Sequence, residues 1–141
     1  MKDLQFGIFT WFGYARPMAK KLDLIKAAGF NSVCTWWGDA FNELDGPKEK
    51  YSELADVRGL HLENAHLPYE EQDLLWQDTG AGDDLLKKLE TDILGASLTG
   101  IPVLVIHPYW SRRVLAQGQN DLFFRRARQL GEAAGRAGVL L

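Results

Sequence analysis

The feature that most constrains the fold is a pattern that occurs four times along the 141 residues of the chain. Each copy is an amphipathic stretch, then a glycine, then a short apolar run. Glycine readily takes the left-handed conformation at a helix end, and the apolar run after it is typical of a buried strand. The pattern therefore predicts alternating helices and strands. The four junctions are Ala27-Ala28-Gly29-Phe30, Val57-Arg58-Gly59-Leu60, Leu98-Thr99-Gly100-Ile101 and Arg136-Ala137-Gly138-Val139.

The strands predicted from this pattern cover residues 5–11, 32–37, 60–66 and 103–107, and a fifth begins at Val139. In the fourth strand, Val103-Leu104-Val105-Ile106 is apolar on both alternating faces, which is typical of a parallel strand covered on both sides. Strands separated by helices form right-handed βαβ crossovers. We therefore expect a parallel α/β sheet.

Two α/β architectures have this order of elements: an open flavodoxin-like sheet and half of an eight-stranded barrel. An open sheet usually has a glycine-rich or acidic first turn, whereas the turn here, Thr10-Trp11-Phe12-Gly13-Tyr14, is aromatic. The sequence also ends at Val139-Leu140-Leu141, within a predicted strand. We therefore predict half of a TIM barrel, about four parallel βα units plus the start of a fifth strand, with residues 1–141 as one partial domain.

Composition and charge limit the possible function classes. Apolar residues make up 46% of the chain and charged residues 25%, with a formal net charge of −3, so neither a membrane span nor nucleic-acid binding through a basic face is expected. Cys34 is the only cysteine, which excludes an intrachain disulfide. The sequence shows no secretory leader, and we expect a cytoplasmic protein.

All five tryptophans follow the predicted strands or lie at their carboxyl ends, where parallel β/α folds place their sites. Tryptophan is often only a core filler, but core filling would scatter these residues between both ends of the sheet. Indole faces stack well on the C–H faces of sugars. We therefore predict an aromatic substrate pocket. Its expected residues are Trp11, Trp37, Tyr109 and Trp110.

Two histidines end neighbouring predicted strands, and each is soon followed by a proline. His66 ends the third strand and His107 the fourth, so both rings are expected at the same rim. Imidazole is a common metal ligand and general acid or base, although a histidine at a strand end is often only a hydrogen-bonding residue. We predict a metal site at His66 and His107. Strict alternation turns Glu63 toward the helices and away from this site.

The long acidic stretch 68–82 is interpreted as a flexible lid over the mouth.

The motifs together resemble the xylose isomerase-like TIM barrels, which include sugar and sugar phosphate isomerases and epimerases and zinc-dependent apurinic endonucleases. The resemblance rests on Phe6-Gly7-Ile8, the Ala27-Ala28-Gly29-Phe30 helix end, the histidine-x-proline at His66 and Ile106-His107-Pro108, and it covers about half of a family domain. It implies an eight-stranded barrel with a divalent ion (Mn, Mg, Zn or Co) at its mouth. In the endonucleases, histidines that match His66 and His107 bind zinc.

In the epimerases of this superfamily, the main metal ligands and the acid/base glutamates come from strands five to eight, and the reaction passes through an enediolate. The resemblance therefore implies a metal-dependent sugar or sugar phosphate isomerase or epimerase, with weak metal binding and weak or absent activity in this chain alone. The alternatives are a non-catalytic sugar-binding or self-assembling half-barrel module and, third, a zinc-dependent DNA-repair endonuclease. The expected partners are a small sugar or sugar phosphate and a second copy that completes the barrel, with no nucleic acid and no membrane.

Overall fold

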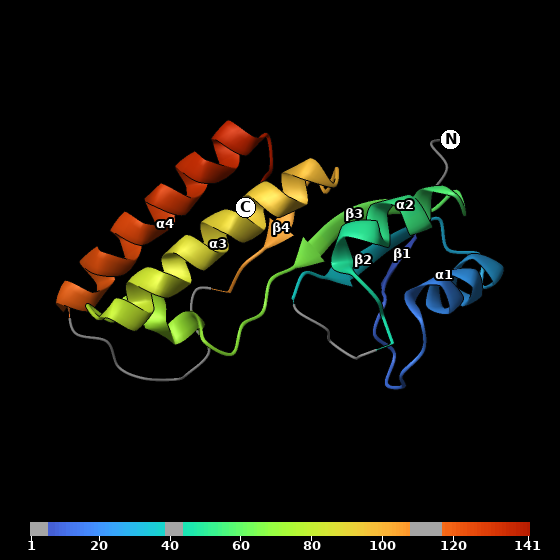
Figure 1. The fold of residues 1–141 in the computed structure, drawn as a ribbon, viewed down its shortest axis with the longest axis horizontal. Helices are drawn as coiled ribbons and strands as arrows, with labels where there is room; N and C mark the ends of the chain where they lie inside the picture. The colour runs from blue at the N-terminus through green and yellow to red at the C-terminus, as the bar shows by residue number, and fades with distance from the viewer. Residues whose placement is uncertain (1–5, 39–43, 108–116) are drawn as a thin grey trace.

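The computed structural model describes residues 6–38, 44–107 and 117–141. Helices and strands alternate along the chain, as the glycine pattern predicts (Figure 1). The four glycines at the predicted junctions all have positive φ, between +61° and +89°. The strands are β1 (Gly7–Phe9), β2 (Ser32–Trp36), β3 (His61–His66) and β4 (Leu104–Val105). The α-helices are α1 (Met18–Ala27), α2 (Tyr51–Asp56), α3 (Gly80–Leu98) and α4 (Gln117–Ala137). Two short 3-10 helices are η1 (Lys48–Lys50) and η2 (Gln72–Trp76).

The four strands form one parallel sheet in the order β1-β2-β3-β4. A flavodoxin-like sheet reverses its strand order near the middle, so this sequential order excludes that architecture. A parallel bridge between Val103 and Leu140 starts the next strand on the far side of β4. The structure therefore confirms the half-barrel prediction, four parallel βα units and the beginning of a fifth strand.

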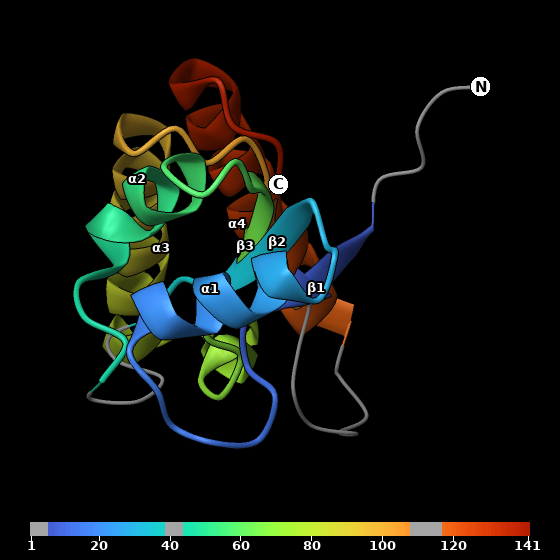
Figure 2. The same cartoon turned by 90° about the vertical axis from the view of Figure 1, so that its right-hand side faces the viewer.

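The helices cover one face of the sheet, and the hydrophobic core lies between them and the strands (Figure 2). From the sheet, Val33, Leu62, Ala65 and Leu104 are buried in this core. The neighbouring side chains along the same strands face the other way and are only half-buried, among them Cys34, Asn64, His66 and Val105. We call this second surface the inner face. The strand at 103–107 is therefore apolar on both faces but covered by helices on one.

A β-bulge in β3 changes the direction of one predicted side chain. Val33 pairs with Leu62 but Cys34 pairs with Asn64, so Glu63 is an extra residue on β3. An extra residue breaks strict alternation. The prediction that Glu63 faces the helices is therefore wrong: its Oε2 atom lies on the inner face, 3.9 Å from the Cys34 Sγ atom.

The segment 68–82 is folded against the core and is not an open lid. Leu75 and Trp76 of η2 are buried, and the ring of Trp76 stacks on that of Phe123 in α4, with centroids 4.1 Å apart. The sequence reads as a loop because its helical turn is short and its main partners come from α4, about 50 residues later.

Among the described residues, no helix has both the length and the apolar character needed to cross a membrane.

Candidate functional site

The two histidines predicted as metal ligands lie together at the carboxyl ends of the strands. His66 is the last residue of β3, and His107 follows β4, the strand next to β3 in the sheet. Their Nε2 atoms are 2.9 Å apart. The Nδ1 atom of His66 is 2.8 Å from the backbone oxygen of Leu67. The parallel sheet thus places both imidazoles at one rim, as the sequence predicts.

The hydrogen-bond partners define the tautomers of the neutral pair. A backbone carbonyl only accepts, so the Nδ1 atom of His66 carries the hydrogen and donates it to Leu67. The Nε2 atom of neutral His66 is then a bare acceptor, and His107 donates to it from its own Nε2. The Nε2 lone pair of His66 therefore accepts the Nε2 hydrogen of His107 in the neutral, metal-free pair.

Burial lowers the pKa of His66, and the neighbouring His107 lowers it further. The Leu67 carbonyl and the Glu70 carboxylate act in the opposite direction, and the net shift is downward from 6.5. His66 is consequently neutral near pH 7. A neutral imidazole is the form that binds a metal ion.

Aromatic rings enclose the pair on two sides. The indole of Trp36 stacks on His66, with ring planes 8° apart and centroids 5.4 Å apart. The ring of Tyr69 stands edge-on to Trp36 and His66 and lies 5.5 Å from His107. We call Trp36, His66, Tyr69 and His107 the rim cluster. Two of its members are aromatic rings, and the other two are the histidines, whose Nε2 atoms are within hydrogen-bond distance of each other.

Of the four residues predicted to contact a substrate, only Trp11 and Trp37 lie within the described part of the chain; Tyr109 and Trp110 lie outside it. Trp37 is 1% exposed and belongs to the core, where its ring lies near Gly95 of α3. It therefore faces the helices, while the adjacent Trp36 faces the rim. Strand register explains this: Trp36 is the partner of His66 in the sheet, so the two residues share the inner face.

Trp11 is half-buried after β1 and lies over a buried ion pair. The Nζ atom of Lys21 is 5.3 Å from the Trp11 ring centroid and 2.5 Å from Oδ1 of Asp45. Both charged side chains are almost fully buried. The structure therefore places the indole of Trp11 against Lys21 of α1.

The histidine pair can serve as part of a metal site. A zinc ion binds imidazole nitrogens tetrahedrally at about 2.0–2.1 Å, so two nitrogens that share one ion lie roughly 3.3 Å apart. The two Nε2 atoms are 2.9 Å apart, so the rings would have to separate by a few tenths of an ångström to share an ion. Within residues 6–38, 44–107 and 117–141, no group of three or more His, Cys, Asp or Glu side chains is placed to hold an ion. The described donors fit an ion but do not complete its coordination.

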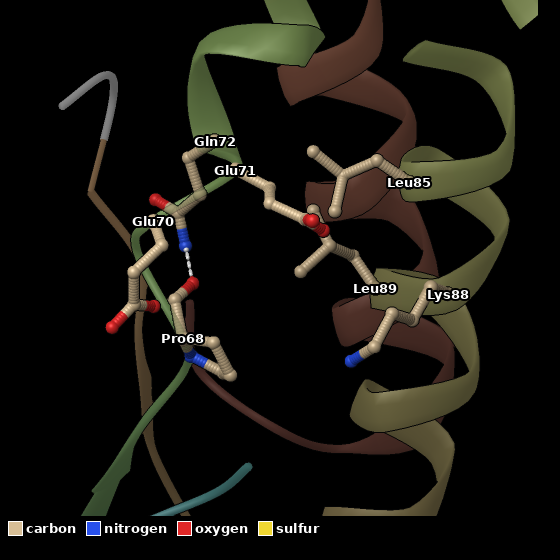
Figure 3. A pocket seen from close by; sticks show the side chains of 7 residues that line it. All are labelled: Pro68, Glu70, Glu71, Gln72, Leu85, Lys88 and Leu89. Carbon is tan, nitrogen blue, oxygen red and sulfur yellow. Dashed lines mark hydrogen bonds between the residues drawn. The ribbon is translucent and has the colours of Figure 1, made fainter. Parts of the chain in front are cut away.

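Two cavities lie close to the rim cluster. One, of about 140 Å³, borders His107 and is otherwise apolar. The other, of about 300 Å³, lies between α3 and the segment that carries Tyr69 (Figure 3). The first is lined by Leu75, Ile106, His107, Phe123, Ala127, Leu130 and Leu141, and the second by Pro68, Glu70, Glu71, Gln72, Leu85, Lys88 and Leu89.

The fold and the rim cluster together define half of a TIM barrel with its candidate site at the carboxyl ends of the strands. The structure is similar to L-ribulose 3-epimerase, with a TM-score of 0.77 and 14% identity over 96% of this chain and 47% of that one. It is also similar to D-psicose 3-epimerase of Clostridium cellulolyticum H10, with a TM-score of 0.74 and 10% identity over 96% of this chain and 50% of that one.

A third similar structure is the xylose isomerase domain protein of Planctomyces limnophilus, with a TM-score of 0.66 and 12% identity over 95% of this chain and 51% of that one. The structural neighbours are thus xylose isomerase-like sugar isomerases and epimerases, and the predicted resemblance in fold is confirmed. The chain spans about half the length of these structures. No protein-family model and no curated protein sequence matches it.

Proposed function

We propose that the chain forms the N-terminal half of a metal-dependent isomerase or epimerase of small sugars or sugar phosphates. The observation that carries the proposal is the convergence of His66 and His107, with Nε2 atoms 2.9 Å apart at the rim. TIM-barrel enzymes have their active sites at this rim. The similar structures named as sugar epimerases support the substrate class.

Two residues of this chain would hold the ion, His66 and His107. A divalent ion there would polarise a substrate carbonyl and so make the adjacent C–H bond more acidic. His66 stays neutral near pH 7 and offers its Nε2 lone pair. His107 would bind the ion through Nε2 only as the other neutral tautomer, with its hydrogen on Nδ1. Catalytic zinc usually has three protein ligands, so we expect weak binding by the pair alone.

The aromatic residues of the rim cluster would form one wall of the sugar pocket. Trp36 and Tyr69 present ring faces and edges beside the histidines, and such surfaces suit the C–H faces of a sugar. They also keep water away from one side of the pair, which strengthens the electrostatic effect of any charge held there.

Metal titration tests the ligand assignment. We expect zinc binding by calorimetry with a stoichiometry near one, weakened at least tenfold in His66→Ala and in His107→Ala. The matched control is His61→Ala, because His61 lies on the same strand and the same face but at the opposite, exposed end. Equal zinc affinity in all four proteins would overturn the assignment.

Deuterium exchange tests the reaction. Incubation with D-fructose or L-ribulose in D₂O, followed by proton NMR, reports loss of the hydrogen beside the carbonyl. We expect slow exchange that needs Mn²⁺ or Zn²⁺ and is absent in His66→Ala. If exchange is no faster than in buffer containing the same ion, the enzymatic proposal is wrong for this chain and the sugar-binding alternative replaces it.

A second proposal concerns assembly. The inner face carries half-buried apolar side chains, including Phe9 and Val105, which lie outside the core that the sheet forms with the helices. We propose that a second copy of the chain covers this face and that the homodimer or larger assembly completes the barrel. Sedimentation velocity at increasing protein concentration tests it: a rise to twice the monomer mass supports assembly, and a monomer throughout contradicts it.

A further inference from the structure

The indole ring of Trp36 lies nearly parallel to the imidazole ring of His66. The sequence pattern instead predicts its neighbour Trp37 as a substrate contact. Trp36 and His66 are partners in the register of β2 and β3. Their ring planes are 8° apart. Trp36 is 9% exposed, so the indole has little space in which to leave this contact.

His66 needs a second constraint because one hydrogen bond does not fix a ring. The imidazole turns about two side-chain bonds, and the outer torsion is broad. The Nδ1 contact with the Leu67 carbonyl fixes one point of the ring. The flat indole lies parallel to the imidazole and blocks its remaining tilt. Together the two contacts direct Nε2 toward His107, 2.9 Å away.

Trp36 is itself held in place by Gly38 and Pro68. A Cβ atom at Gly38 would lie 2.5 Å from the Nε1 atom of Trp36 and 2.9 Å from Cγ of Pro68. Real Cβ atoms are almost never that close to another heavy atom. The edge of the indole therefore occupies space that only a glycine leaves open.

Tyr69 closes the cluster from a segment that is also anchored. The side-chain amide of Gln72 donates to the Pro68 carbonyl at 2.6 Å (Figure 3), and Glu70 accepts a hydrogen bond from the Tyr69 backbone at 3.1 Å. Tyr69 stands edge-on to Trp36 and His66. The orientation of the histidine pair is thus supported from two separate segments.

We propose that Trp36 is a positioning residue of the histidine pair, which it orients for an ion by stacking on His66. It touches no ion itself, and it acts through the ring of His66. The inference rests on the proposed function only in that the pair is taken to hold an ion; the stacking is a property of the metal-free protein. Loss of groups that orient a metal ligand typically weakens metal affinity by about 10–100-fold.

Three variants test the proposal: Trp36→Leu removes the stack, Trp36→Phe keeps a smaller ring, and Gly38→Ala displaces the indole without removing it. The control is Trp76→Phe, since Trp76 is also a nearly buried, ring-stacked tryptophan but packs on α4. Zinc affinity is measured by calorimetry on variants whose circular dichroism matches the parent. We expect a loss of about 10–100-fold in Trp36→Leu and Gly38→Ala, a smaller loss in Trp36→Phe and none in Trp76→Phe.

Nitrogen-15 NMR of the imidazoles in the metal-free protein gives a second measurement. A residue that only stabilised the fold would not change the tautomer of His66. In the parent we expect His66 as a single Nδ1-protonated tautomer, and in Trp36→Leu a mixture of tautomers. An unchanged tautomer together with unchanged zinc affinity would overturn the proposal. If the parent binds no zinc but the tautomer still depends on Trp36, the metal part of the proposed function fails while the positioning role stands.

Discussion

Arg126 of α4 is expected to be one of the most important side chains for stability. It is 4% exposed. Its Nη1 atom donates to the backbone oxygens of Leu74, Leu75 and Gln77 at 3.2, 3.1 and 2.8 Å. Its Nη2 atom lies 2.6 Å from Oδ1 of Asp83. One guanidinium thus connects α4 with η2 and the first turn of α3.

The expected cost of Arg126→Met follows from these acceptors. Methionine keeps much of the apolar stem but leaves three carbonyls without this donor. The Leu74 and Gln77 oxygens still accept from the backbone N–H groups of Gln77 and Thr79, so each loses only one hydrogen bond, which costs about 0.5–1 kcal/mol. The Leu75 oxygen is buried with this donor, and a buried acceptor left without a partner costs about 1–3 kcal/mol. The side chain of Asp83 is 61% exposed and can be hydrated. The neutral methionine avoids the desolvation cost of a buried guanidinium, which offsets part of this loss. We therefore expect a net destabilisation of about 2–3 kcal/mol.

Urea unfolding followed by tryptophan fluorescence measures this loss. For a domain of this size the midpoint should move down by on the order of 1 M. Arg128→Met is the matched control, because Arg128 is exposed on the same helix, and its effect should stay within about 0.5 kcal/mol. If Arg126→Met costs less than about 1 kcal/mol, or no more than Arg128→Met, the reasoning from the carbonyl contacts is refuted.

Three further outcomes are expected. Lys21→Met should lower the free energy of unfolding by about 3–5 kcal/mol, because it leaves the Asp45 carboxylate buried without its partner. The double variant Lys21→Met/Asp45→Leu should recover much of that loss. A double-mutant cycle from urea unfolding measures the coupling between the two residues, and additive losses would argue against it. Burial, and to a smaller extent Glu63, raises the pKa of the Cys34 thiol, so Glu63→Gln should increase the rate of iodoacetamide alkylation at pH 8, and an equal or slower rate would contradict the contact. The pKa of His66 in the folded state lies below its unfolded value of 6.5, so the unfolded state binds more protons just below that pH. His66 should therefore lower the free energy of unfolding as the pH falls from 7 to 5. In His66→Gln, the free energy of unfolding should depend less steeply on pH over this range.

Much of the fold was predictable because it depends on local signals. Glycine at each helix end, apolar runs after it and helices between strands specify parallel βα units, and the structure has them. The meeting of His66 and His107 was predictable for the same reason: parallel strands bring their carboxyl ends to one edge.

The errors came from features that a one-dimensional pattern does not carry. The direction of Glu63 depends on a bulge, which is visible only once β3 is paired with β2. The inner position of Trp36 follows from its register with His66, a signal that strand pairing could have supplied. The folded segment at η2 depends on Arg126 and Phe123, which are distant in sequence.

The extra residue in β3 separates two requirements that a regular strand could not meet together. In a strand of strict period two, residues 62 and 66 point the same way; here Leu62 fills the core and His66 points to the opposite side. Deleting Glu63 would therefore restore strict alternation and leave the remaining side chains of the strand on their present faces. A single inserted residue thus lets one strand supply both a core leucine and a histidine at the rim.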